Sequence, residues 1–370
     1  MAKIAIVATD SWYVWNFRAD TIRRLVSDGY AVTVYSGNRD YLDHLSALGT
    51  QVEYLPLDGR RVRPLRELGV LLRFIWRLKR DSPDIVLSFN PKANLYTGLA
   101  RHLVRFGWIA NISGLGVLGE ISGFWSLLVL RIFRIAFIHV NHCIFQNEAD
   151  LEAWKDAKIV PADLSSRQFG TGVNLSEFAC VQPPEGALKV ICIARLLEKK
   201  GIGEYIELAK SVRSKAPRID FLLAGNHVPV SHGGFPAEKI AAAEAAGHIQ
   251  YLGMLEDVQP LLSGRTVGCL LTRYKEGIPR SMIEFLATGR PILISSFDAA
   301  TDLVPDQSNG HIVAVQESNW LETASDYIMD LEENPEQYQI LCCNARAMAE
   351  TRFDGNVGIE EYLKQIKNLL

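Results

Sequence analysis

The 370-residue sequence lacks the cysteine and histidine patterns of disulfide-linked or metal-binding proteins. Its six cysteines show no CxxC spacing, and most of them lie in apolar segments. This distribution predicts reduced thiols buried in the cores of a cytoplasmic protein. The eight histidines are scattered without metal-ligand spacing, so we expect no metal site built from them.

Other absent motifs exclude further classes of function. Neither half carries GxGxxG after its first strand, and the chain continues TDSWYVWNFR there, which disfavours a nicotinamide-dependent dehydrogenase. The net charge is −3 and no nucleic-acid motif is present, so nucleic-acid binding is disfavoured. The opening MAKIAIVATD lacks the charged and apolar regions of a signal peptide, and we expect a cytoplasmic protein.

Short apolar, β-branched runs alternate with helical patterns, which is typical of doubly wound parallel sheets. The predicted strands cover residues 3–9, 31–37, 51–57, 84–90, 108–113 and 142–147 in the first half, and 188–194, 219–225, 249–253, 267–272, 291–295 and 311–315 in the second. We predict a first domain over residues 1–172, a linker over 173–189, a second domain over 190–353 and a C-terminal helix over 354–370. Substrates would then bind in a cleft between two facing sheets.

Residues 274–290, YKEGIPRSMIEFLATGR, place two carboxylates around the predicted start of a helix. Pro279 suits the first turn and Gly289 the end. Glu276 then lies in the preceding loop and Glu284 inside the helix. A helix N-terminus attracts phosphate, and a carboxylate beside it can bind hydroxyl groups, so the pattern favours a sugar nucleotide. The alternative is a pair of solvated surface glutamates.

This segment resembles the retaining glycosyltransferases of family 4, in which two glutamates separated by seven residues flank an EG-x-P loop. The matching residues are Glu276, Gly277, Ile278, Pro279 and Glu284. The resemblance implies that the first glutamate and the following backbone amides contact the donor sugar and diphosphate. It implies that the second glutamate holds the ribose.

The resemblance continues upstream. In IARLLEKKGI, Arg195 and Lys200 look like the family's basic pair for the donor diphosphate, with surface solubility as the alternative. LLAGN and YLG supply Asn226 and Gly253 as further donor-binding positions. No two aspartates are two positions apart, so no Asp-x-Asp is available to hold a metal ion on the diphosphate. We expect metal-independent catalysis without a cofactor, in which protein groups neutralise the diphosphate.

The family implies an α/β protein of the GT-B fold, with two Rossmann-like domains facing across a cleft and a C-terminal helix that crosses back to the first domain. It implies transfer of a hexose or N-acetylhexosamine from a UDP-sugar to a lipid-linked saccharide with retention of configuration. The first half looks most like bacterial transferases that build polysaccharides or glycoprotein oligosaccharides on undecaprenyl diphosphate, including N-acetylgalactosaminyltransferases.

Two short segments of the first half are candidates for the acceptor side. In family 4 the first loop contacts donor phosphate or acceptor, which implies that Asn16, Phe17 and Arg18 line the cleft. A capped helix with a packed aromatic cluster is the alternative. In ISGLG, Ser113 and Gly114 follow the fifth strand, where glycines permit close approach of a ligand. Many family members have a histidine in this region, which this sequence lacks.

The halves of the chain differ in charge. Residues 1–180 hold 21 Lys and Arg against 17 Asp and Glu (+4), and the remainder holds 18 against 25 (−7). Arg60–Arg80 contains eight basic residues and one acid with Phe74 and Trp76 at helical spacing, which predicts docking on an anionic membrane surface. An ordinary crossover helix is the alternative. Residues 123–140 are apolar on nearly every side and predict a buried helix or a lipid-facing one. We therefore expect a peripheral protein on the inner face of the cell membrane.

Two other functions stay open from the sequence. A UDP-N-acetylglucosamine 2-epimerase would share the fold and donor pocket but would need no acceptor. A non-catalytic nucleotide-sugar-binding membrane scaffold would bind the donor without turnover. The intact set of Arg195, Lys200, Glu276 and Glu284 favours an active enzyme over the scaffold.

Overall fold

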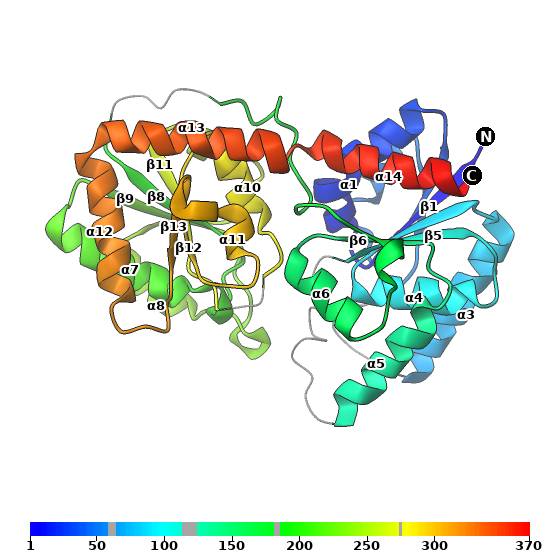
Figure 1. Ribbon diagram of the computed structural model, residues 1–370. Helices are drawn as coiled ribbons and strands as arrows, with labels where there is room; N and C mark the ends of the chain where they lie inside the picture. The colour runs from blue at the N-terminus through cyan, green and yellow to red at the C-terminus, as the bar shows by residue number, and fades with distance from the viewer. Residues whose placement is uncertain (58–63, 113–123, 181–185, 274–275) are drawn as a thin grey trace. The chain divides into compact units, whose positions relative to one another are not determined.

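The computed structural model describes residues 1–57, 64–112, 124–180, 186–273 and 276–370. Ser113, Gly114, Arg60, Arg61 and Arg63 lie outside these ranges. The chain divides into two compact units (Figure 1): unit 1 comprises Met1–Gln168 with Asn356–Leu370, and unit 2 comprises Phe169–Gly355.

Unit 1 is built on a seven-stranded parallel sheet in the order β3-β2-β1-β4-β5-β6-β7. Its strands are β1 (Lys3–Ala8), β2 (Ala31–Ser36), β3 (Gln51–Tyr54), β4 (Ile85–Phe89), β5 (Gly107–Ile112), β6 (His142–Phe145) and β7 (Ser165–Arg167). Its helices are α1 (Ser11–Ser27), α2 (Leu42–Ser46), α3 (Pro64–Asp81), α4 (Pro91–Arg101), α5 (Phe124–Phe137), α6 (Glu148–Asp156) and α14 (Gly355–Leu369).

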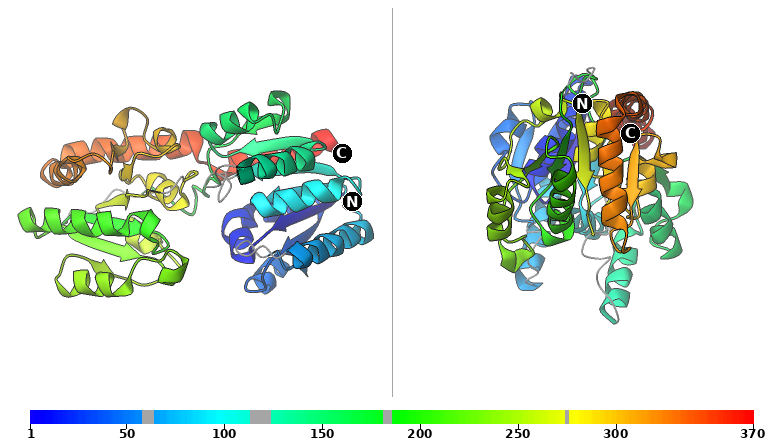
Figure 2. Two further views of the ribbon diagram at one scale, coloured as in Figure 1. Left: turned by 90° about the horizontal axis from the view of Figure 1, so that it is seen from below. Right: turned by 90° about the vertical axis from the view of Figure 1, so that its left-hand side faces the viewer.

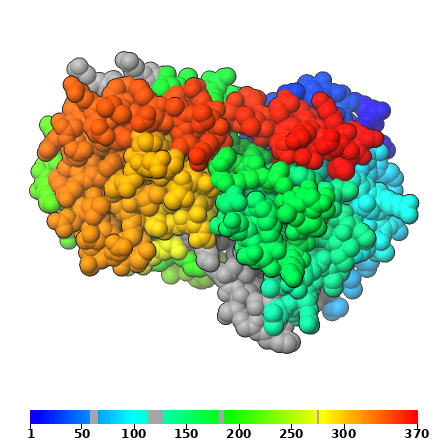
Figure 3. All heavy atoms as spheres, viewed as in Figure 1, coloured from blue at the N-terminus to red at the C-terminus, as the bar shows by residue number. Residues whose placement is uncertain are grey.

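Two apolar cores lie on the two faces of this sheet. One joins the strands to α3, α4 and α5 through side chains such as Phe74, Tyr96 and Phe137. The other joins them to α1 and α14 through Ile22 and Leu363. Helices therefore cover both faces (Figure 2), as parallel sheets require. The outer side of α14 forms part of the surface of the unit (Figure 3).

Unit 2 is built on a six-stranded parallel sheet in the order β10-β9-β8-β11-β12-β13. Its strands are β8 (Lys189–Ile193), β9 (Asp220–Ala224), β10 (Gln250–Tyr251), β11 (Thr266–Leu270), β12 (Ile292–Ser295) and β13 (Gly310–Val313). Its helices are α7 (Ile202–Lys215), α8 (Ala237–Ala245), α9 (Gln259–Leu262), α10 (Arg280–Ala287), α11 (Ala300–Leu303), α12 (Trp320–Glu333) and α13 (Pro335–Arg352).

Successive residues of β8 show how the second sheet is packed. Val190 and Cys192 point into the core formed with α7 and α12, whereas Ile191 points into the core formed with α10. This alternation explains why the strand is apolar at consecutive positions. All six cysteines are free thiols and four of them are buried, as expected from their apolar surroundings.

The predicted fold class is confirmed, because both sheets are parallel and doubly wound and all twelve predicted strands are present. The domain limits differ in detail from the expectation. The described residues from Phe169 onward, including those assigned to a linker, belong to unit 2, and the last residues, from Asn356, belong to unit 1. Among the described residues, no helix combines the length and apolar character needed to span a membrane.

Candidate active site

A glycine holds together two loops at the switch point of unit 2. The strand order reverses between β8 and β11, and parallel sheets bind ligands beyond the carboxyl ends of such strands. Gly201, just before α7, has φ +75°, and a Cβ there would lie 1.9 Å from the carbonyl oxygen of Leu271. Only glycine fits this position. It brings the loop after β8 against the loop after β11.

Lys200 and Glu276 form an ion pair across these loops. The Lys200 Nζ lies 2.5 Å from the Glu276 Oε1, and only 15% and 11% of the two side chains are exposed. The Thr272 hydroxyl lies 3.2 Å from the same oxygen and 3.0 Å from the carbonyl oxygen of Lys199. Two residues predicted to bind the donor are thus in contact, in a partly shielded place where charge interactions are strong.

Three more predicted donor residues lie at the carboxyl ends of neighbouring strands. Arg195 follows β8, Asn226 follows β9 and Gly253 follows β10. The loops are joined by backbone hydrogen bonds, from Leu196 N to Asn226 O at 3.1 Å and from Gly225 N to Gly253 O at 2.8 Å. Arg195 and Asn226 are exposed. The structure therefore gathers these residues on the sheet edge that carries Lys200.

The helix predicted after Glu276 is α10, which begins at Arg280 with Pro279 as its N-cap residue. It ends at Ala287, and Gly289 follows with φ +71°, as expected for a helix stop. Gly277 and Ile278 lead into the helix, and the Ile278 side chain packs into the apolar core. Only the backbone of Ile278 is therefore suited to contact a ligand.

Glu284 lies in the second turn of α10 and is largely buried. Burial raises the pKa of the Glu284 carboxyl, while the charge of Arg280 and its hydrogen bond lower it. The Arg280 Nε lies 2.9 Å from the Glu284 Oε1. Arg280 thus stabilises a carboxylate that burial alone would tend to protonate.

In unit 1 the structure changes the interpretation of Arg18. Its side chain is only 2% exposed, and its guanidinium carbon lies 4.4 Å from the centroid of the Phe89 ring. The guanidinium donates to the Tyr13 hydroxyl at 2.9 Å, and Tyr362 of α14 lies close by. The expectation that Arg18 lines a binding surface is wrong, because α14 and the strand ends enclose it.

The neighbours of Arg18 match the alternative of a capped helix with an aromatic cluster. Asp10 caps α1 by accepting from the Trp12 N–H at 2.9 Å, and the ring of Phe17 packs against Trp12 at 5.5 Å. Asn16 is exposed, and its side chain donates to the Trp12 carbonyl at 2.9 Å.

Sequence reasoning missed Arg273, which follows Thr272 in the loop after β11. Its guanidinium forms an ion pair with Glu204, an almost fully buried carboxylate in the first turn of α7. Arg273 and Thr272 also line a pocket of about 660 Å³ with Phe297 and Asp298, at the ends of β11 and β12. The sequence signal was the position of Arg273 directly before the 274–290 segment.

The sequence of unit 2 matches a known protein family. Residues 176–348 match the model of the family described as glycosyl transferases group 1, and this range contains all the unit 2 site residues. The protein is a GT-B glycosyltransferase with a group 1 domain. The resemblance seen in the sequence is confirmed at this level.

Curated relatives of this glycosyltransferase include two bacterial enzymes. The chain is 24% identical over 371 residues to the N,N'-diacetylbacillosaminyl-diphospho-undecaprenol alpha-1,3-N-acetylgalactosaminyltransferase of Campylobacter jejuni, covering 95% of this chain and 94% of that enzyme. It is 22% identical over 192 residues to the amylovoran biosynthesis glycosyltransferase AmsK of Erwinia amylovora, covering 49% of this chain and 45% of that enzyme.

Solved structures agree on the fold. The crystal structure of Anabaena Alr3699/HepE in complex with UDP has a TM-score of 0.80 to this glycosyltransferase at 16% identity, with 100% of both chains covered.

Among the described residues, no group of three or more His, Cys, Asp or Glu side chains could hold a metal ion.

Proposed function

We propose that this glycosyltransferase transfers a hexose or N-acetylhexosamine from a UDP-sugar to a lipid-linked saccharide. The transfer retains the anomeric configuration and serves the synthesis of a surface polysaccharide or glycan. The observation that carries the proposal is the Lys200–Glu276 ion pair at the switch point of unit 2. The relatives support the substrates: the Anabaena structure contains UDP, and the Campylobacter enzyme is named for a sugar linked to undecaprenyl diphosphate.

In this proposal the donor diphosphate takes the place of a carboxylate beside Lys200. The ammonium exchanges Glu276 for phosphate oxygens, and Glu276 then accepts a hydrogen bond from the transferring sugar. Arg195 and the N-termini of α7 and α10 add positive potential. Preorganised donors of this kind contribute roughly 3 kcal/mol each to stabilising developing charge, so the scheme needs no metal ion or other cofactor.

Retention would follow from attack on the face of the sugar from which the diphosphate leaves. The bond from the anomeric carbon to the diphosphate oxygen breaks, and the acceptor hydroxyl oxygen bonds to that carbon. The hydroxyl proton passes to the leaving phosphate oxygen. Lys200 and Arg195 stabilise the negative charge that grows on the diphosphate.

Contact with an anionic membrane is the second part of the proposal, and α3 supports it. Its exposed apolar side chains are Leu65 (88%), Leu68 (54%), Leu72 (56%) and Trp76 (59%). Spacings of three and four residues place them along one side of the helix. Arg66, Arg73 and Lys79 are also exposed. An apolar stripe flanked by basic residues suits the interface of an anionic bilayer.

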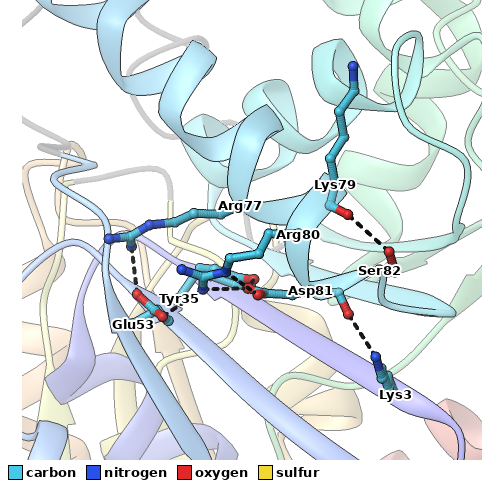
Figure 4. A network of polar contacts seen from close by, with 8 residues as sticks. All are labelled: Lys3, Tyr35, Glu53, Arg77, Lys79, Arg80, Asp81 and Ser82. Atoms are coloured by element: carbon cyan, nitrogen blue, oxygen red, sulfur yellow. Dashed lines mark hydrogen bonds and ion pairs between the residues drawn. The ribbon is translucent and has the colours of Figure 1, made fainter.

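Not every basic residue of α3 is available to lipid. Figure 4 shows Arg77 and Arg80 turned toward Glu53 and Asp81, whereas the side chain of Lys79 extends away from this network. Arg77 lies 3.1 Å and Arg80 2.8 Å from Glu53, and Arg80 lies 2.6 Å from Asp81. We therefore assign the lipid contact to Arg66, Arg73 and Lys79 within the expected Arg60–Arg80 region.

α5 offers a second lipid-facing side. Phe133 and Phe137 are buried against the core, whereas Ile132 and Ile135 of the same helix are exposed, as is Ile138 directly after it. The helix is thus apolar on both its buried and its exposed side, as its composition indicated. Like α3, it packs beside α4.

A direct test is to incubate the protein with UDP-, GDP- and ADP-sugars, with and without an undecaprenyl-diphosphate-linked saccharide. We expect transfer from a UDP-sugar only when the acceptor is present, unchanged by EDTA, and an NMR coupling constant that shows the donor's anomeric configuration in the product. Epimerisation of the donor without acceptor, inversion, or activity that requires added manganese or magnesium would contradict the corresponding part of the proposal.

A further inference from the structure

The start of α10 packs against the segments through which the chain passes between the two units. The chain enters unit 2 at Phe169 and leaves it after Gly355. These segments lie side by side: Val173 N donates to Phe353 O, and Gly355 N donates to Val173 O, both at 2.9 Å. Gly172 has φ +64°, and a Cβ there would lie 2.7 Å from the Gly355 Cα.

The start of α10 lies in close contact with the first of these segments, at Gly170. A Cβ at Gly170 would lie 3.1 Å from both the Ile278 Cβ and the Ile283 Cδ1. Ile278 lies two residues after Glu276, and Ile283 directly precedes Glu284, so both isoleucines are close in sequence to the candidate glutamates. The backbone around Gly170 is therefore a direct support of the candidate donor site.

Arg280 joins that support to the second glutamate. Its Nε lies 2.9 Å from the Glu284 Oε1, and its Nη1 donates to the carbonyl oxygen of Gly172 at 3.4 Å. A quarter of the Arg280 side chain is exposed, compared with 13% of Glu284. The planar guanidinium of Arg280 thus contacts both the Glu284 carboxylate and the backbone carbonyl of Gly172.

We propose that Arg280 is a positioning residue: it fixes the Glu284 carboxylate for the nucleoside of the donor by anchoring it to the Gly172 carbonyl. The inference rests on the proposed function, in which Glu284 binds the ribose. Arg280 itself need not touch the donor. Its effect on donor affinity passes through Glu284, because a carboxylate held in one rotamer loses less conformational entropy when the ribose hydroxyls bind.

The two contacts of residue 280 depend on the shape of the guanidinium as well as on its positive charge. A guanidinium presents several N–H groups in a rigid plane and can hold two oxygens at once, whereas a lysine ammonium is a point charge on a flexible stem. Lysine at position 280 would keep the charge beside Glu284 and lose the fixed geometry. Methionine would lose both.

The chain provides a matched control in Arg346. Its Nε lies 2.6 Å from Glu350, four residues onward, and its Nη1 donates to the carbonyl oxygens of Phe178 at 2.9 Å and Ala287 at 2.6 Å. Arg346 thus shares the pairing and the backbone contacts of Arg280. Its partner Glu350 is largely exposed, and Arg346 contacts the C-terminal end of α10.

The test is titration of UDP, with GDP and ADP as comparisons, into wild type, R280M, R280K, E284Q, R280M/E284Q and R346M, with thermal unfolding of each variant recorded. We expect R280M to weaken UDP binding about tenfold, the usual effect of losing one charge-assisted hydrogen bond. R280K should recover part of this loss. R280M/E284Q should bind no more weakly than E284Q, because Arg280 acts through Glu284. R346M should bind like wild type.

In a transferase assay, R280M should raise the donor KM about tenfold and change kcat less than about threefold. Wild-type UDP affinity in R280M while E284Q binds weakly would overturn the inference alone. An equal loss in R346M, or additive losses in the double variant, would do the same by showing a general structural effect. A wild type that binds none of the three nucleotides would contradict both the inference and the proposed function.

Discussion

The two units use the same fold but treat charge differently at the carboxyl ends of their strands. In unit 2, Lys200 and Glu276 form an ion pair, and we propose that the donor diphosphate replaces Glu276 in it. In unit 1, Arg18 lies among aromatic rings and a tyrosine hydroxyl, under α14. A cation enclosed by neutral partners stabilises its own unit, whereas a cation paired with a carboxylate in a partly open loop can accept phosphate. The partners of a charge therefore indicate its role better than its place in the topology.

The largest effect should come from separating the two glutamates of unit 2. If Glu276 contacts the transferring sugar, E276A should lower kcat about 100-fold. E284A should mainly raise the donor KM, because Glu284 is proposed to hold the ribose. Steady-state kinetics with a UDP-sugar and a lipid-linked acceptor measure both. Small and equal effects of the two changes would contradict the proposed roles of both glutamates in donor binding.

The second effect concerns the enclosed charge of unit 1. R18A should lower the free energy of unfolding by about 2 kcal/mol, because it removes a buried side chain with its cation–π and hydrogen-bonding contacts. UDP affinity should stay within about twofold of wild type. Denaturant unfolding and UDP titration give the two values, and R23A on the same helix, where Arg23 is exposed, is the control for stability. A loss of UDP affinity without loss of stability would return Arg18 to the binding site.

The third effect is a pH dependence of donor binding. Burial raises the pKa of Glu284 above that of an ordinary glutamate, so the carboxylate takes up a proton at a higher pH. As the pH falls through this raised pKa, Glu284 loses both its pairing with Arg280 and its capacity to accept ribose hydroxyls, and UDP affinity should fall. E284Q cannot titrate and should lack this step. Equal pH profiles for wild type and E284Q would contradict the assignment.

The smallest effect extends the comparison to the arginines of α3. R73Q should weaken binding to phosphatidylglycerol vesicles about fivefold, since each basic residue near an anionic surface contributes about 1 kcal/mol. R77Q is the matched change at a residue already paired with Glu53 and should have less effect. Vesicle sedimentation at low and high salt measures both. Equal loss in the two variants would argue against the proposed lipid contact.

Most of the fold could be predicted, because buried parallel strands are apolar at consecutive positions and their turns are marked by glycine and proline. β7 was missed because its three residues, Ser165–Arg167, are polar and carry no pattern. In unit 2 the motif residues met as expected, since they follow neighbouring strands. Arg280 could have been noticed, because residues four apart on a helix face each other.

The burial of Arg18 could not be predicted from its neighbours in sequence. It depends on Tyr362 of α14, which packs on the ring cluster from the far end of the chain and accepts a hydrogen bond from Asn111 at 2.7 Å. The pairing of Arg273 with Glu204 likewise joins the loop after β11 to the first turn of α7, which only the sheet order brings together. Long-range packing of this kind leaves no local signal.

The central claim is that the donor nucleotide binds at the switch point of unit 2 through Lys200. The most direct test is calorimetric titration of UDP into wild type, K200M and K199M, because Lys199 is the exposed neighbour on the same turn. We expect at least about tenfold weaker binding in K200M and a change below about twofold in K199M. UDP affinity in K200M equal to that of wild type would contradict it.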